Sequence, residues 1–151
     1  MHRCVLKQLT QKHGNTEAQK PRTYKSKDSL FTELTDRIIR CAIAVHKELG
    51  PGLAEYSYQT ALALEFDAAD VSYEREPPVV VRYRDVVVGH HRPDFVVGNK
   101  VVVELKSASN VDPVFAKQVL TYLRVTKLRV GLLLNFNVSS LGSQGIRRFQ
   151  L

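Results

Sequence analysis

Cysteine is scarce in this chain, and its two copies lie far apart. Cys4 lies near the N-terminus, whereas Cys41 lies in a segment whose apolar spacing predicts a helix. Two cysteines are too few to ligate an iron–sulfur cluster or a structural zinc ion. Nothing in their positions indicates a disulfide between the two regions. We therefore expect reduced thiols and a cytoplasmic location.

Long apolar runs are lacking as well. No run reaches the roughly 20 residues that a membrane-spanning helix needs. The opening MHRCVLKQLTQKHG has no apolar stretch of the kind found in secretory signals, although it is basic and contains no acid before Glu17, so organelle targeting stays an alternative. The 151 residues are 44% hydrophobic and 25% charged, values that suit one globular domain with a single core.

Positive charge is concentrated at the N-terminus. Residues 1–29 hold seven Lys or Arg against Glu17 and Asp28, whereas residues 30–151 hold fifteen against thirteen acids. We expect a basic, unstructured tail over residues 1–29 and a folded domain over residues 30–151. The tail either attracts phosphate backbones without recognising sequence or is a solvated leader.

The spacing of apolar residues predicts an α/β fold. Helices are expected at about residues 35–49, 54–69 and 113–126, and strands at 79–83, 86–88, 95–97, 101–106, 130–134 and, as a short edge, 146–151. Thr35 is expected to cap the first helix. Tight turns predict an antiparallel meander from residue 79 to 106, with Gly89 ending its second strand. The continuous apolar run at 130–134 is typical of a strand buried on both faces.

Charged residues interrupt the apolar strands at one place. Glu104 and Lys106 are two residues apart on one strand and so project from the same face. Asp94 precedes the neighbouring strand, and the connecting loop decides whether it meets Glu104. A two-residue turn would pair Asp94 with Val103, on the opposite face; a three-residue loop at 98–100 pairs it with Glu104. Only the three-residue loop gives a clean apolar core face, so we expect that register.

Two adjacent carboxylates and a lysine favour phosphodiester chemistry. The carboxylates repel each other unless a proton or a cation lies between them. Hard oxygen ligands that leave room for several waters suit Mg²⁺ or Mn²⁺. Such an ion binds phosphate oxygen and lowers the pKa of a bound water, and Lys106 would orient that water or stabilise charge on phosphorus. The alternative is a polar strand end that emerges into solvent.

These residues resemble a known family. Pro93-Asp94 and, ten positions later, Glu104-Leu105-Lys106 resemble the PD-(D/E)XK nuclease superfamily, and residues 52–58 (GLAEYSY) match the GxxExxY motif of one of its branches. Flanking phrases of that branch are present at residues 49–53 and 131–136. The resemblance covers about residues 34–149. It implies a restriction-endonuclease-like fold, a mixed central sheet flanked by helices.

The resemblance also implies roles for individual residues. Asp94, Glu104, Lys106 and Glu55 would form the catalytic set, and Glu55, Asp94, Glu104 and Leu105 would bind the metal. Glu55 is alternatively an acid favoured by the helix dipole alone. Gln118 and Tyr122, one helical turn apart, resemble a Gln-x-x-x-Tyr element that lines a nucleic-acid channel, with Tyr122 stacking on bases. Their alternative is a buried tyrosine beside a surface glutamine.

Three hypotheses of function follow. The first is a Mg²⁺- or Mn²⁺-dependent nuclease that acts on DNA in preference to RNA. The second is a catalytically silent nucleic-acid-binding module of the same fold. The third is a regulatory subunit that needs a partner protein or a second copy. The neighbours His90 and His91 point to opposite strand faces and are not expected to share a metal. His46 is expected at a helix C-terminus, where imidazolium is favourable, and Arg147-Arg148 at a solvated end.

Overall fold

A computed structural model of the chain describes residues 27–151, with side chains from Phe31 onward. The predicted tail over residues 1–29 therefore lies almost entirely outside the described residues. The elements in chain order are α1 (Lys27–Leu49), α2 (Glu55–Ala68), β1 (Tyr73–Arg75), β2 (Val79–Tyr83), β3 (Val86–His91), β4 (Phe95–Val97), β5 (Val101–Lys106), α3 (Pro113–Thr126), β6 (Val130–Asn135), a π-helical turn η1 (Leu141–Gly145) and β7 (Ile146–Gln150).

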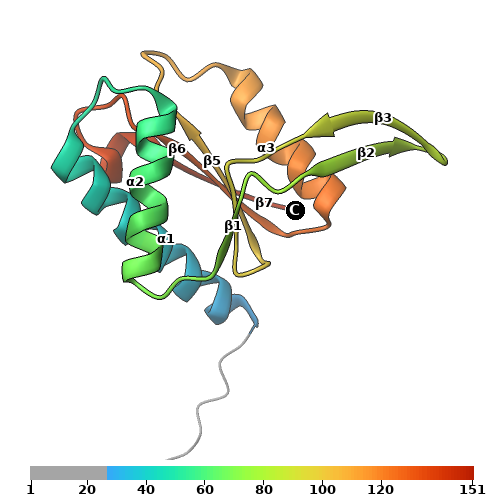
Figure 1. Cartoon of the computed structure of the whole chain (residues 1–151), viewed down its shortest axis with the longest axis horizontal. Helices are drawn as coiled ribbons and strands as arrows, with labels where there is room; N and C mark the ends of the chain where they lie inside the picture. The colour runs from blue at the N-terminus through green and yellow to red at the C-terminus, as the bar shows by residue number, and fades with distance from the viewer. Residues whose placement is uncertain (1–26) are drawn as a thin grey trace, which may run out of the picture.

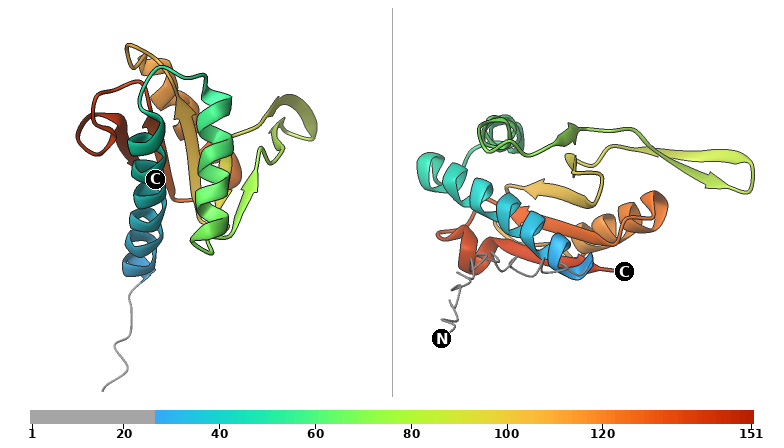
Figure 2. Two further views of the ribbon diagram at one scale, coloured as in Figure 1. Left: turned by 60° about the vertical axis from the view of Figure 1, so that its left-hand side comes forward. Right: turned by 90° about the horizontal axis from the view of Figure 1, so that it is seen from below.

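A mixed five-stranded sheet forms the centre of the molecule, in the order β1-β4-β5-β6-β7. β5 and β6 run parallel, joined by the α3 crossover, and the other neighbours in this sheet are antiparallel. α1 and α2 cover one face and α3 covers the other (Figures 1 and 2). The α/β fold predicted from the sequence, a mixed sheet flanked by helices, is confirmed.

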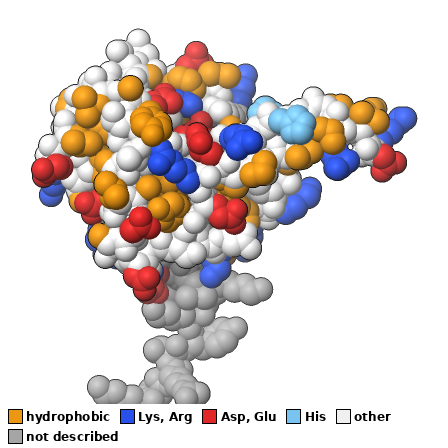
Figure 3. Space-filling model, viewed as in Figure 1, with side chains coloured by type: hydrophobic (Ala, Val, Ile, Leu, Met, Phe, Trp, Pro, Cys, Tyr) orange, Lys and Arg blue, Asp and Glu red, His pale blue; other side chains and the backbone are white. Residues whose placement is uncertain are grey.

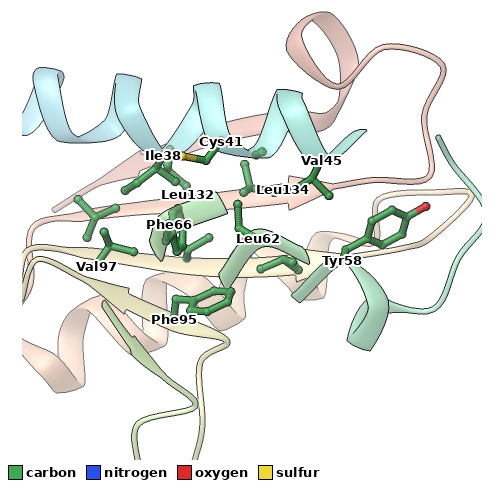
Figure 4. Packing of buried hydrophobic residues seen from close by; sticks show 14 of the residues in the cluster. Ile38, Cys41, Val45, Tyr58, Leu62, Phe66, Phe95, Val97, Leu132 and Leu134 are labelled. Atoms are coloured by element: carbon green, nitrogen blue, oxygen red, sulfur yellow. The ribbon is translucent and has the colours of Figure 1, made fainter. Parts of the chain in front are cut away.

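The core lies mainly between the sheet and the α1–α2 layer. Alternate residues of β4 and β5 point into it, from Phe95 to Leu105, and meet Ile38, Leu62 and Phe66 of the two helices (Figure 4). Complete burial of each such large apolar side chain contributes roughly 1.5–3 kcal/mol. β6 is buried along its whole length, as its apolar run predicts. Most of the driving force for folding therefore comes from this layer.

The opposite face of the sheet packs against α3. Val96 and Val102 point toward Tyr122 and Leu123 and form a second, smaller cluster. Gly131 on β6 permits the close approach of this helix, because a Cβ atom there would lie only 2.6 Å from Cγ1 of Val119. The sheet is thus buried on both faces near β5 and β6, where the charged residues occur.

The first helix begins earlier than the sequence indicates. α1 starts at Lys27, so Thr35 lies in its interior and is not a cap. Thr35 is buried, and its hydroxyl lies 2.9 Å from the carbonyl oxygens of both Phe31 and Thr32. Because those carbonyls accept the hydroxyl proton, a polar residue is tolerated inside the helix. The capping prediction at Thr35 is therefore wrong.

The predicted single meander is also wrong. β2 and β3 form a separate two-stranded sheet that projects from the body, and β3 continues through Gly89 to His91 (Figures 1 and 2). The short strand β1, which was not predicted, pairs with β4 in their place. The hairpin cannot join the main sheet there because β1 already occupies the free edge of β4.

Two other predictions concern buried polar groups of α1. His46 lies in the last turn of the helix but is 7% exposed, and its Nε2 donates to the carbonyl of Val138 at 2.9 Å. It is thus a packed core residue and not only a dipole partner. Cys41 is a free, buried thiol whose pKa is raised by burial. No helix in the described range is long and apolar enough to cross a membrane.

Candidate active site

Strand register places Asp94 opposite Glu104. β4 pairs with β5 through Phe95↔Val103 and Val97↔Val101, so the connection is the three-residue loop at 98–100. Gly98 and Asn99 take positive φ values of 57° and 53°, which a tight turn of this kind requires. The register predicted from the apolar face is confirmed, and it places Asp94 beside Glu104 near the end of β5.

Asp94 is held by two donors. Its Oδ2 accepts from the main-chain N–H of Leu105 at 2.7 Å, and its Oδ1 accepts from Nε2 of Gln59 at 2.9 Å. The N–H of Asp94 lies 3.4 Å from Oε2 of Glu104, so the two carboxylates are neighbours. Burial raises the pKa of Asp94, although the Leu105 N–H opposes the rise. The two hydrogen bonds therefore fix the orientation of the Asp94 side chain, and a nearby positive charge would stabilise its buried carboxylate.

Glu104 and Lys106 form an ion pair beside it. Nζ of Lys106 donates to Oε1 of Glu104 at 2.9 Å, and Glu104 is only 4% exposed. Burial and then the charge of Asp94 raise the pKa of Glu104 to about 7, because together they outweigh Lys106. Burial lowers the pKa of Lys106, but the charge and hydrogen bond of Glu104, together with the charges of Glu55 and Asp94, outweigh this effect and leave the pKa raised. The lysine is accordingly a cation at neutral pH.

Tyr58, the last residue of the GxxExxY segment (residues 52–58), anchors the loop that precedes α2. The Tyr58 hydroxyl donates to the carbonyl of Gly50 at 2.6 Å and accepts from the N–H of Leu53 at 3.1 Å. Its ring is fully buried and stacks on Phe136 at a centroid distance of 4.4 Å. Ser107, just after β5, donates to the carbonyl of Leu53 at 2.6 Å. The loop that precedes α2 is thereby attached to the strand that carries Glu104 and Lys106.

Glu55 lies in the region of Asp94 and Glu104 but does not form a metal-ligand cluster with them. It is the first residue of α2 and is exposed. Its negative charge contributes to the raised pKa values of both Asp94 and Lys106, so it faces the same region. Within residues 27–151 no group of three or more His, Cys, Asp or Glu is placed to hold a metal ion. A role for Glu55 as third ligand therefore remains a prediction.

Comparison with known proteins identifies the family. Residues 32–149 match the family model of the PD-(D/E)XK nuclease superfamily. The chain belongs to this superfamily. No curated protein and no solved structure gave a match. Members of the superfamily typically use divalent metal ions, and nucleic acid is the substrate class that membership implies. The matched range contains Glu55, Asp94, Glu104 and Lys106.

Gln59 and Arg75 also connect to this candidate site, and the sequence alone did not indicate either residue. Arg75 on β1 donates to Oε1 of Gln59 through Nη2 at 2.7 Å and through Nε at 3.1 Å. Because arginine can only donate, the amide oxygen must face it, which turns Nε2 toward Asp94. Gln59 lies one helical turn after Glu55, a spacing that could have indicated a shared face. Arg75 gave no such signal because β1 was not predicted.

The Gln118–Tyr122 pair is present, but its tyrosine is buried. Nε2 of Gln118 donates to the Tyr122 hydroxyl at 2.8 Å, and Tyr122 is 2% exposed. Burial and then the nearby charge of Glu104 raise the pKa of this phenol, so the pair borders the site. The Tyr122 ring has no face free to stack on a base, contrary to the stacking prediction. Half-buried Gln118 is the member of the pair that is open to solvent.

The remaining polar candidates lie away from the carboxylates. His90 and His91 are exposed on β3, and the His91 ring lies 6.0 Å from that of Tyr122. Arg147 and Arg148 are exposed on the edge strand β7, with Nη1 of Arg148 3.5 Å from the Thr35 hydroxyl. None of the four contacts Asp94, Glu104 or Lys106 in the hydrogen bonds of residues 27–151.

Proposed function

We propose that the protein is a divalent-metal-dependent nuclease, of the GxxExxY branch, that cuts DNA in preference to RNA. One observation carries this proposal: Asp94 and Glu104 lie side by side at a buried strand end with the Lys106 ammonium 2.9 Å from Glu104. A polar strand end that simply met solvent would not bury two carboxylates against each other, because burial of unbalanced charge is costly.

The donor set fits Mg²⁺ or Mn²⁺. Asp94 and Glu104 offer carboxylate oxygens, and Leu105 offers a main-chain carbonyl. The N–H and C=O of one strand residue point to the same side, so the Leu105 carbonyl faces the side on which its N–H meets Asp94. Mg²⁺ commonly uses one or two carboxylates and keeps several waters. When bound, the ion would neutralise phosphate charge and lower the pKa of a water.

The chain's own residues would orient the reacting groups. Leu105 N–H and Gln59 hold Asp94, so little reorganisation is needed when a cation arrives. Lys106 is protonated and shares a strand face with Glu104, from which its Nζ can donate to an attacking water or to a phosphate oxygen. Glu55, the first residue of α2 directly after the loop that Tyr58 anchors, is proposed as the third acid. Gln118 is proposed to contact the nucleic acid at the rim.

Charge supports a nucleic-acid partner. After Asp112 the chain contains six Lys or Arg and no Asp or Glu, all on α3, the following turn or β7. These side chains are exposed and comprise Lys117, Arg124, Lys127, Arg129, Arg147 and Arg148. An exposed surface with one sign of charge attracts phosphate backbones without base recognition. The free Cys41 thiol agrees with the proposed cytoplasmic location.

A cleavage assay tests the proposal. The full chain is incubated with single- and double-stranded DNA and RNA in Mg²⁺, Mn²⁺ or chelator. We expect metal-dependent cleavage that Lys106→Ala abolishes. Lys100→Ala is the matched control, since Lys100 is an exposed lysine at the other end of β5, and it should cleave normally. Thermal unfolding of the parent is measured with and without metal in parallel. If the melting temperature does not depend on metal and no substrate is cleaved, the nuclease proposal is rejected and the silent binding module is favoured.

A further inference from the structure

The β2–β3 hairpin exposes an unusual amount of apolar surface. It projects beyond the body, with its tip free (Figures 1 and 3). Five of its large apolar side chains are exposed, namely Val80 (37%), Tyr83 (63%), Val86 (64%), Val87 (39%) and Val88 (60%). These residues lie on both faces of the ribbon. Exposed apolar side chains concentrated on one element in this way are typical of interaction sites.

Only the base of the hairpin is supported by the rest of the domain. Val79 is buried, His91 contacts the Tyr122 ring, and Arg92 donates to the carbonyl of Glu76 at 3.4 Å. α3 packs mainly beside β2, and among the ring contacts it meets β3 through His91 at the base of the hairpin. Within residues 27–151 no strand pairs with the outer edge of β3. An isolated two-stranded hairpin is marginally stable in water, so a partner on that edge would stabilise it.

The chemistry of β3 indicates which kind of partner fits. The strand contains no Lys, Arg, Asp, Glu or Pro, the residues that commonly protect an exposed edge from pairing. A β-bulge leaves Val88 without an opposing residue on β2. Nucleic-acid interfaces are polar and strongly positive, whereas this edge consists of three valines, a glycine and two histidines and has no Lys or Arg. A protein strand is thus the better match.

Charge placement favours a second copy of this chain as that partner. Around a two-fold axis each surface must complement itself. Two β3 strands can pair antiparallel with no charged residue opposite another. Two β2 strands would instead bring Arg82 and the adjoining Arg84 of each copy together.

We propose that β3 pairs antiparallel with β3 of a second copy, which joins the two hairpins into one four-stranded sheet. Val86 and Val88 become buried on assembly. The dimer then contains two candidate active sites, one in each copy, and in each copy Asp94 follows β3 by three residues. This inference goes beyond the nuclease proposal and does not rest on it.

Solution mass tests the pairing without metal or nucleic acid. Light scattering and sedimentation of the full chain over a dilution series should give twice the 17.1 kDa of one chain. The double variant Val86→Lys/Val88→Lys should raise the dissociation constant at least about 100-fold, from lost burial and like-charge repulsion. Leu64→Lys is the matched control, because Leu64 on α2 is 65% exposed, and it should leave the dimer intact.

Charge complementation separates pairing from misfolding. Val86→Glu/Val88→Glu should also be monomeric alone, but mixing it with the lysine double variant should restore a dimer that contains one copy of each. Circular dichroism should show both variants folded. A parent that is monomeric at every concentration, or a dimer unchanged by the lysine substitutions, would overturn the proposal. A monomeric parent whose nucleic-acid affinity falls in the glutamate variant would assign the hairpin to nucleic acid instead.

Discussion

Two valine-rich segments of this chain look alike in sequence and have opposite environments. Val101, Val102 and Val103 of β5 are completely buried, whereas Val86 and Val88 of β3 are 64% and 60% exposed. Both segments are β-branched runs next to tight turns, and both form strands. The difference is that α1, α2 and α3 cover the β4–β5 pair, while only the base of the hairpin meets α3. Local sequence decides that a strand forms, and distant segments decide whether it is buried.

The same contrast applies to charge. Asp94, Glu104 and Lys106 lie on the covered pair, where burial shifts their pKa values and each has a polar partner. Arg82 and Arg84 lie on the hairpin and are exposed to solvent. Charges in the covered region interact strongly because little water lies between them, whereas water screens the charges on the hairpin.

The largest expected effect is on catalysis. Lys106→Ala should lower the rate of DNA cleavage on the order of 1000-fold, since it removes the cation next to the reacting phosphate. Arg82→Ala on the hairpin should stay within about twofold. Metal binding by Lys106→Ala, measured as a Mg²⁺-dependent thermal shift, should persist because protonated lysine donates no lone pair. Equal losses in the two variants would show that Lys106 acts only through general charge.

Truncation of one valine in each region should separate burial from strand formation. Val103→Ala leaves a cavity in the core and should lower the free energy of unfolding by ~2 kcal/mol. Val86→Ala, studied at a dilution where the chain is monomeric, should lower it by less than about 0.5 kcal/mol. Urea unfolding measures both. A large loss at Val86 would mean that the hairpin packs against the body in solution.

The buried glutamate should make stability depend on pH. The raised pKa of Glu104, about 7 against an ordinary 4.5, means that the folded state binds more protons than the unfolded state between these values. Without metal, the free energy of unfolding should therefore fall as pH rises from about 4.5 to about 7. Glu104→Gln should remove this fall, on the order of 3 kcal/mol, while keeping an acceptor for Lys106. Exposed Asp85→Asn on the hairpin should leave the profile unchanged.

Protons and metal should compete for the same carboxylates. Mg²⁺-dependent stabilisation should weaken as pH falls from 8 to 6 in the parent, over the range in which Glu104 becomes protonated. An invariant thermal shift across this range would argue against Glu104 as a ligand.

Loss of the bridging amide should give a smaller effect. Gln59→Ala removes one donor to Asp94 and the acceptor for Arg75, so it should lower stability by ~1 kcal/mol and reduce the Mg²⁺-dependent shift. Gln118→Ala breaks only the bond to Tyr122 and serves as the comparison. A normal metal response in Gln59→Ala would show that the orientation of Asp94 does not depend on the amide.

The smallest expected effect distinguishes two roles of Glu55. Glu55→Gln removes an acid from the first turn of α2 and should lower metal-free stability by no more than ~0.5 kcal/mol. If Glu55 is a ligand, the Mg²⁺-dependent shift should also shrink. A change in metal-free stability with an unchanged metal response would assign the residue to the helix dipole alone.

Several features were predictable from the sequence because they depend on local pattern. The apolar alternation around residues 98–100 allowed only one register that keeps a clean core face, and that register places Asp94 beside Glu104. The helix at Pro113–Thr126 was predicted at its observed bounds, with Asp112 as its N-cap in the structure. The continuous apolar run of β6 predicted a strand buried on both faces.

Only the tertiary structure decided which of these elements meet. The sequence could not show that β1 would take the edge of β4 and leave the hairpin free, since strand pairing is a competition between distant segments. Nor could it show that Gln59 and Arg75 orient Asp94, or that Tyr122 would be buried, because each contact joins separate elements. Residue type and period determine what an element is. Its environment depends on the neighbours that the fold brings to it, which sets burial, pKa and exposure.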